Sequence, residues 1–116
     1  MIGRFILILM AIACWATSAF AHAFLNHAEP GAGAALKVSP SRVALVFTET
    51  LEPAFSGVAV TDSFGRSVEA GQVVIHGNAM VAPLRSLAPG SYRVVWHAVS
   101  VDTHRTEGAY SFVVKP

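Results

Sequence analysis

The sequence predicts an all-β protein, an immunoglobulin-like Greek-key antiparallel β-sandwich or barrel of about seven strands. Short segments that are apolar, or that alternate between apolar and polar residues, recur along residues 22–116 and end at turn residues. The same range shows no sustained apolar period of about 3.6 residues, which is the pattern of an amphipathic helix. Tyr92 follows Pro89-Gly90 near the start of the longest segment, an arrangement typical of the tyrosine corner of Greek-key sandwiches.

The first half of this range predicts three strands, because each segment is apolar or β-branched and turn residues follow it. The expected strands lie at residues 24–28, 42–47 and 57–61. In the second of them Val43, Leu45 and Phe47 alternate with other residues, so they should share the buried face. Residues 32–36 are compatible with one helical turn.

The second half predicts a hairpin followed by two further strands. His76-Gly77-Asn78 separates two apolar segments and is expected to form the hairpin turn. The expected strands lie at residues 73–75, 79–81, 91–101 and 109–114. Alternation assigns these side chains of the last two strands to the buried face: Tyr92, Val94, Trp96, Ala98, Tyr110, Phe112 and Val114.

Residues 1–21 are typical of a secretory signal peptide. Arg4 supplies the positive start, residues 5–13 form an uncharged apolar run, and Ala19-Phe20-Ala21 supplies a cleavage site of small residues. The alternative, a transmembrane anchor, needs about 20 apolar residues, and residues 4–21 are short for that. We therefore expect export to the periplasm and one mature domain, residues 22–116.

The composition of the mature domain excludes several kinds of site and partner. Cys14, the single cysteine, leaves with the signal peptide, so neither a disulfide nor a thiolate ligand remains. Lipidation of Cys14 is the competing interpretation, but Ala11-Ile12-Ala13 fits a lipoprotein signal poorly. Without Arg4, seven Lys and Arg residues stand against seven Asp and Glu residues. No basic run with interleaved aromatic residues is present, so no nucleic-acid partner is expected.

Five histidines lie in residues 22–116, and His22 holds a special position among them. Cleavage after Ala21 makes it the first residue, so that its free amine and its imidazole can close one chelate ring on a metal. The amine has an ordinary pKa of about 7.7–8.0, low enough for a metal to displace its proton near neutral pH. Taken alone, a histidine at this place can also be an accident of where cleavage falls.

Asp102 and His104 form the second candidate part of a metal site. They follow the longest predicted strand and lie two residues apart, so they should project to the same side of an extended segment. With His22 they supply an amine, two imidazoles and one carboxylate, a set that suits square-planar copper(II) better than zinc. Copper(I) prefers sulfur, and Met80 is the one methionine of the mature domain. The alternative for Asp102 is an ordinary turn residue.

Motifs along the whole mature domain carry a family resemblance. They are His22-Ala23 and residues 29–34, 46–49, 55–58, 87–92, 95–96, 99–104 and 108–114. With these motifs the chain resembles the CopC/PcoC family of periplasmic copper-resistance proteins over residues 22–116. It departs from members that carry methionine-rich segments for copper(I), and Phe24 stands where some members have a second histidine.

The resemblance implies a Greek-key domain that binds one copper(II) ion through His22, Asp102 and His104. Glu49 matches a family acid near that site, where it would contact a ligand or the axial position of the metal. The resemblance also implies a role in copper resistance, buffering or trafficking, with a membrane copper transporter of the CopD type as a partner. The remaining histidines match no part of the site and are expected to be structural or surface residues: His27, His76 and His97.

Because four donors would fill the equatorial plane of the metal, little room remains for a small-molecule substrate. We therefore expect a binding protein and not an enzyme. Two other functions fit parts of the pattern. One is an oxidase or monooxygenase with a copper brace at an N-terminal histidine, which Asp102 disfavours because such enzymes generally lack an equatorial carboxylate. The other is a metal-free immunoglobulin-like interaction module, which a copper titration would distinguish.

Overall fold

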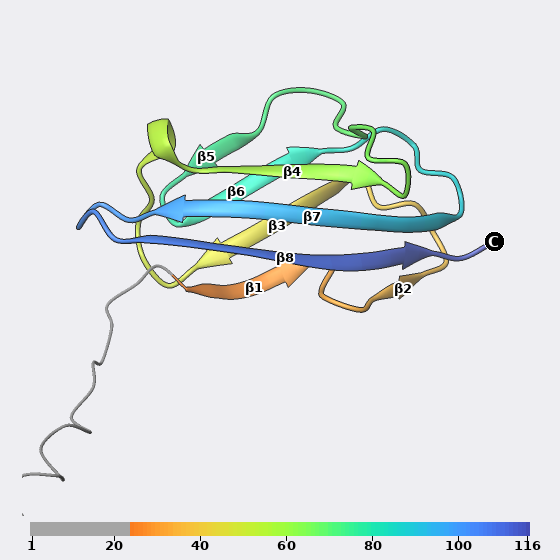
Figure 1. Cartoon of the computed structure of the whole chain (residues 1–116), viewed down its shortest axis with the longest axis horizontal. Helices are drawn as coiled ribbons and strands as arrows, with labels where there is room; N and C mark the ends of the chain where they lie inside the picture. Colours follow the sequence, from red (N-terminus) through yellow and green to blue (C-terminus); the bar gives the residue numbers. More distant parts are fainter. Residues whose placement is uncertain (1–23) are drawn as a thin grey trace, which may run out of the picture.

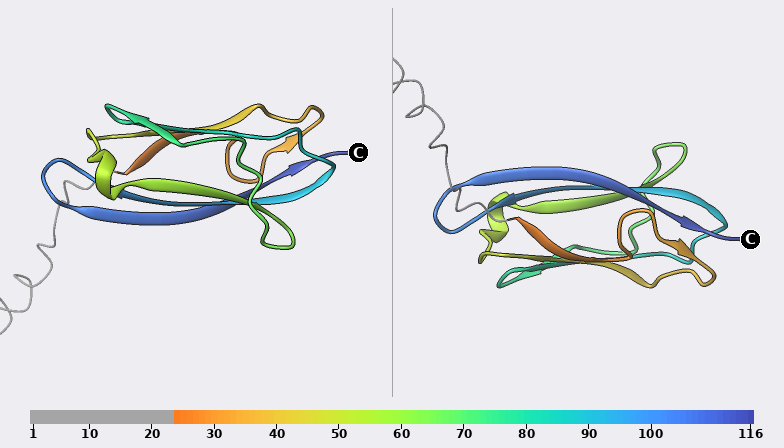
Figure 2. Two further views of the ribbon diagram at one scale, coloured as in Figure 1. Left: turned by 90° about the horizontal axis from the view of Figure 1, so that it is seen from above. Right: turned by 90° about the horizontal axis from the view of Figure 1, so that it is seen from below.

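The computed structural model describes residues 24–116, which form two four-stranded β-sheets packed face to face (Figures 1 and 2). One sheet has the strand order β1-β3-β6-β5 and the other has the order β2-β8-β7-β4. This sandwich confirms the predicted all-β class. The strands are β1 (Leu25–Glu29), β2 (Ala35–Leu36), β3 (Arg42–Phe47), β4 (Gly57–Asp62), β5 (Val74–His76), β6 (Ala79–Pro83), β7 (Gly90–Val99) and β8 (Arg105–Val114).

The described residues contain eight strands, where the sequence predicted about seven. The additional strand is β2, which has two residues and pairs in parallel with Val113 and Val114 of β8. It lies where one helical turn seemed compatible with the sequence. Only the short 3-10 helix η3 (Pro53–Phe55) is helical in this part of the chain. Between residues 24 and 116, no helix is long and apolar enough to cross a membrane.

The predicted boundaries differ most from the structure at β8, at the end of β7 and at the hairpin turn. β8 begins at Arg105 and not at residue 109, because residues 105–108 complete the ladder with the far half of β7. Their polar side chains and Gly108 concealed the strand. β7 ends at Val99, since the chain turns back at Ser100. His76 is the last residue of β5, and the turn itself consists of Gly77 and Asn78, with Gly77 at a φ of 60°.

The alternating side chains of β3 and β7 fill the space between the sheets. Val43, Leu45 and Phe47 are at most 1% exposed, and β7 buries Tyr92, Val94, Trp96 and Ala98. Phe47 of one sheet meets Trp96 of the other edge to face, with 5.1 Å between ring centroids. Met80 is fully buried in the same core.

The tyrosine corner predicted at Tyr92 is present. Its hydroxyl donates a hydrogen bond to the carbonyl of Ala88, four residues upstream, and its ring stacks on Phe112 of the neighbouring strand. Tyr110 makes a second link of this kind, because its hydroxyl donates to the Pro30 carbonyl at 2.9 Å. Burial raises the pKa of Tyr110 to about 12, so this hydroxyl keeps its proton through the neutral range.

Several strands begin or end at one end of the sandwich, which we name the copper end after the copper ligands that the sequence predicts there, Asp102 and His104. β1 begins there and β3 ends there, since Leu25 pairs with Phe47. β7 ends and β8 begins at the same end, where Val99 pairs with Arg105 (Figure 1). The fold therefore brings the start of the described chain to the same end as the β7–β8 turn.

Gly108 should tolerate no side chain, because it lies directly opposite Trp96 in the β7–β8 ladder. A Cβ atom on Gly108 would lie 2.6 Å from Cζ2 of Trp96, whose ring is held against Phe47. We expect Gly108→Ala to lower the free energy of unfolding by about 1–3 kcal/mol, the usual cost of overpacking a core.

Gly71→Ala is the matched control, since its added Cβ would come no closer than 3.6 Å to Pro83. Urea unfolding of both variants measures the difference. Equal stabilities of the two variants would show that Trp96 can move aside.

Candidate metal centre

The turn between β7 and β8 is closed by its own backbone. The Ser100 amide donates to the His104 carbonyl at 2.9 Å, and the Thr103 amide donates to the Ser100 carbonyl at 2.8 Å. Thr103 has a φ of 73°, which lies in the left-handed region that a β-branched residue rarely adopts. The Thr103 hydroxyl donates to the Asp102 carbonyl at 2.6 Å. The segment is thus a tight turn and not the extended segment that the sequence predicted.

The turn nevertheless brings the two predicted ligands together. Nδ1 of His104 lies 3.2 Å from Oδ2 of Asp102. The side chain of His104 is 50% exposed and that of Asp102 is 40% exposed, so an ion from solvent can reach both. Their convergence comes from the left-handed conformation at Thr103, which reverses the chain between them.

The Asp102 carboxylate has a different partner on each oxygen. The Ser100 hydroxyl donates a hydrogen bond to Oδ1, while Oδ2 faces His104. The hydrogen bond from Ser100 is the main cause that lowers the pKa of Asp102 below its ordinary value of 3.8. Partial desolvation opposes this shift, and the hydrogen bonds and charge of His104 add to it. Asp102 is therefore an anionic oxygen donor at neutral pH.

The spacing of the pair fits a copper ion. Two donors on adjacent corners of a square-planar site, each about 2.0–2.1 Å from the metal, stand about 3 Å apart. Asp102 Oδ2 and His104 Nδ1 are 3.2 Å apart, which is close to this separation. One imidazole nitrogen and one carboxylate oxygen agree with the preference of copper(II) for nitrogen and oxygen ligands.

The segment after β3 connects this turn to the start of the described chain. The Val101 amide donates to the Thr50 carbonyl at 3.1 Å, which fixes the turn from one side. Phe24 and Thr48 exchange two hydrogen bonds: the Thr48 amide donates to the Phe24 carbonyl at 2.9 Å, and the Phe24 amide donates to Oγ1 of Thr48 at 3.0 Å. Glu49 is half-buried between these two anchor points. His22, the third predicted ligand, lies outside the described residues.

The other histidines of the described residues lie in strands and not in the β7–β8 turn. His27 is an exposed residue of β1, 3.6 Å from Glu29, and His76 ends β5 in solvent. His97 lies on β7 opposite Gly57 and Glu107. Within residues 24–116, no group of three His, Cys, Asp or Glu side chains is arranged to hold a metal. The described part of the chain therefore contributes a pair of donors, and a complete site needs donors from elsewhere.

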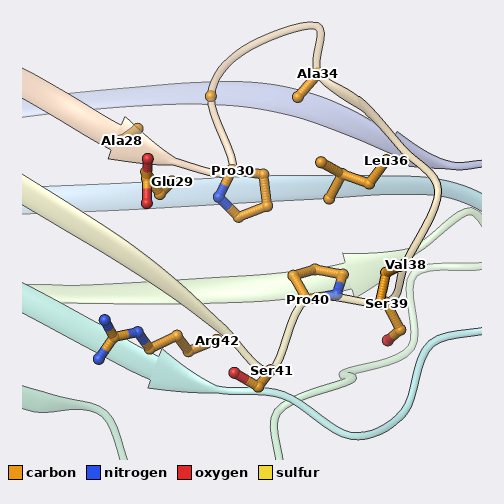
Figure 3. Close-up of a pocket in the computed structure, with 11 residues that line it drawn as sticks. Ala28, Glu29, Pro30, Ala34, Leu36, Val38, Ser39, Pro40, Ser41 and Arg42 are labelled. Atoms are coloured by element: carbon orange, nitrogen blue, oxygen red, sulfur yellow. The ribbon is translucent and has the colours of Figure 1, made fainter.

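The sandwich also has a hollow of about 530 Å³ (Figure 3). It opens between the end of β1, the following loop and the start of β3, with Pro30, Leu36 and Pro40 in its lining. Its charged residues are Glu29 and Arg42, which lie at the far ends of β1 and β3 from Leu25 and Phe47. It therefore shares no residue with the Asp102–His104 pair.

Sequence reasoning assigned no role to Ser100, although its side chain contacts the predicted ligand Asp102. The alternation along β7, continued by two residues, puts residue 100 on the buried face. A serine at a buried position two residues before Asp102 was therefore the available signal.

Comparison with known proteins decides the family. The CopC domain family matches residues 25–115. The chain belongs to the CopC family. It is 36% identical over 116 residues to protein YobA of Escherichia coli K12, covering 97% of this chain and 94% of that protein. It is also 36% identical over 110 residues to copper resistance protein C of Escherichia coli, covering 86% of each. The CopC family, which includes relatives named for copper resistance, is a family of non-enzymatic proteins.

A third CopC-family relationship involves a longer protein. The chain is 30% identical over 113 residues to copper transport protein CutJ of Bacillus subtilis, covering 94% of this chain but 21% of CutJ. Solved structures agree with the fold. CopC from Methylosinus trichosporium OB3b superimposes with a TM-score of 0.71 at 37% identity, covering 82% of this chain and 95% of that one. PcoC from Escherichia coli, described as a methionine-rich copper resistance protein, gives a TM-score of 0.69 at 37% identity, with 82% and 100% coverage.

The lowered pKa of Asp102 predicts a pH dependence of stability in the metal-free protein. Because its folded pKa lies below its unfolded value, ionised Asp102 stabilises the fold above the unfolded pKa of about 4 and loses this effect as the pH falls through the folded pKa. We expect Asp102→Asn to be less stable than the wild type at pH 7, with a difference that shrinks below about pH 4. Urea unfolding across this range measures it, and a difference independent of pH would contradict the assignment.

Proposed function

We propose that this CopC-family protein is a periplasmic copper(II) carrier or buffer that holds one copper ion per chain at the copper end. Its ligands are the amine and imidazole of His22, the carboxylate of Asp102 and the imidazole of His104. The single observation that carries this proposal is the accessible Asp102–His104 pair, 3.2 Å apart, at the end of the sandwich where the described chain begins.

His22 is within reach of that end. It precedes Phe24 by two residues, and two extended residues span up to about 7 Å. Phe24 is hydrogen-bonded to Thr48, and the neighbouring Thr50 is hydrogen-bonded to the turn that carries the pair. Cleavage after Ala21 would free the amine of His22 as a ligand next to its own imidazole. The proposed domain is therefore residues 22–116, preceded by a signal peptide of residues 1–21.

The donor set favours copper(II) over copper(I). Three nitrogens and one carboxylate oxygen suit the tetragonal geometry of copper(II), whereas copper(I) prefers thiolate or thioether sulfur. The mature domain has no cysteine, and the sulfur of Met80 lies in the core between the sheets, away from solvent. Glu49, half-buried between Thr48 and Thr50, is placed to contact a ligand of the copper or its axial position.

The partner that we propose is a membrane copper transporter of the CopD type. The support is copper transport protein CutJ, in which a region similar to this chain makes up 21% of a longer protein. A domain joined covalently to a transport protein in one organism can act as a separate partner in another. A ligand set at an exposed end, with both described donors open to solvent, suits transfer of the ion between proteins.

Among the histidines, His104 should matter most for copper(II) after His22. We expect His104→Ala to weaken copper(II) binding at least tenfold, which is about 1.4 kcal/mol, because it removes a ligand. His76→Ala and His97→Ala are matched controls and should bind as the wild type does, since the histidine that forms the pair with Asp102 is His104. Chelator competition measures the affinities. Equal losses in all three variants would place the site elsewhere.

An extra residue before His22 should weaken copper(II) binding strongly and leave the fold intact. The addition converts the His22 amine into an amide without a free lone pair, so the amine–imidazole chelate is lost. The new terminal amine lies one residue further away and cannot close the same ring. We expect a loss of more than tenfold in affinity for residues 22–116 preceded by one methionine.

Intact mass must first show that the methionine is retained, and circular dichroism should be unchanged because the extension precedes β1. An extended protein that binds copper(II) as tightly as the protein beginning at His22 would refute the role of the N-terminus.

A further inference from the structure

Among the described residues, Ser100 is the polar side chain that the fold buries completely, with 0% exposure. A buried hydroxyl costs free energy unless it has a hydrogen-bond partner, and alanine would occupy the same space without that requirement. Ser100 also holds its place without the hydroxyl, because its amide bonds to the His104 carbonyl and its carbonyl accepts from the Thr103 amide. The hydroxyl is therefore not needed to hold the turn, and its role depends on the groups that it contacts.

The hydroxyl contacts the carboxylate of the copper pair. Its oxygen donates to Oδ1 of Asp102 and lies 3.3 Å from the His104 carbonyl. A hydroxyl has one proton to donate, and the charged carboxylate of Asp102 is a stronger acceptor than a backbone carbonyl. Oδ1 thereby accepts from a hydroxyl that is itself buried, and Oδ2 is the oxygen that faces His104.

We propose that Ser100 is a positioning residue for copper, which fixes the Asp102 carboxylate so that Oδ2 and the His104 imidazole are presented together as adjacent ligands. This inference rests on the proposed copper(II) site and adds to it a residue that never touches the metal. Hydrogen-bond partners of metal ligands commonly change metal affinity by about 10–100-fold when they are removed. Loss of the hydroxyl would leave Oδ1 free to rotate, to bind water or to join Oδ2 on the metal.

The test compares Ser100→Ala with Ser56→Ala in the protein beginning at His22. Ser56 is a matched control, because its hydroxyl also bonds near the end of β7, accepting from the Val99 amide at 3.0 Å, but does not contact Asp102. We expect copper(II) affinity to fall about 10–100-fold in Ser100→Ala and to stay within twofold of the wild type in Ser56→Ala. The copper(II) electron paramagnetic resonance spectrum should change in Ser100→Ala alone.

A pair of isosteric variants is the control for a folding defect in Ser100→Ala. Ser100→Thr keeps the hydroxyl and Ser100→Val replaces it with a methyl group, so both add the same bulk to the buried site. We expect Ser100→Thr to bind copper(II) about 10–100-fold more tightly than Ser100→Val, and to keep the wild-type spectrum.

A double-mutant cycle tests whether Ser100 acts through Asp102. In an Asp102→Ala background the hydroxyl has no carboxylate to hold, so adding Ser100→Ala should change the copper(II) affinity by less than twofold. An equal loss with and without Asp102, or wild-type affinity and spectrum in Ser100→Ala, would overturn the proposal. If Ser100→Ala binds normally while His104→Ala binds weakly, the role of Ser100 fails and the copper site stands. Normal binding in both variants would instead reject the site itself.

Discussion

The closure of residues 100–104 onto the end of the sandwich is the constraint on which the candidate site depends. Two backbone hydrogen bonds between Ser100, Thr103 and His104 reverse the chain, and a third ties Val101 to Thr50. A site that binds a labile ion needs its donors held before the ion arrives, because each ordering step otherwise subtracts from the affinity. This turn supplies such order with backbone groups, and leaves the side chains of Asp102 and His104 accessible to the metal.

The core of the sandwich holds the two strands, β7 and β8, that the turn connects. β7 reaches the copper end as a strand whose alternate residues are buried, and Trp96 is clamped between Phe47 and Gly108. Because β8 pairs with β7 along its full length, the two strands that hold the turn cannot separate without breaking the longest ladder of the fold. The donors thus lie on a short connection between rigid strands, which is more precise than a long loop.

Periodicity predicted the parts of the fold that alternate. The alternating residues of β3 and β7 were assigned to the core and are buried there: Val43, Leu45, Phe47, Tyr92, Val94, Trp96 and Ala98. β2 was missed because two residues carry no period and its pairing with β8 is a tertiary contact. The start of β8 was missed because Thr106 and Gly108 are not apolar, although Gly108 is required opposite Trp96.

For the candidate site too, the sequence predicted one part and missed another. The types and spacing of Asp102 and His104 predicted a pair of donors, and the structure brings the two together. The sequence could not predict how, because a positive φ at Thr103 is unusual for a threonine and depends on the hydrogen bonds around it. Ser100 escaped notice since its role depends on burial and on one contact, neither of which is visible in a short polar motif.

A crystal structure of copper(II)-loaded residues 22–116, with anomalous diffraction recorded at the copper edge, tests the central claim most directly. The account predicts one anomalous peak per chain at the copper end, bonded to the amine and imidazole of His22, the Asp102 carboxylate and the His104 imidazole. A dominant peak at His27, His76 or His97, or a copper ion at the copper end that lacks the His22 amine, would contradict it.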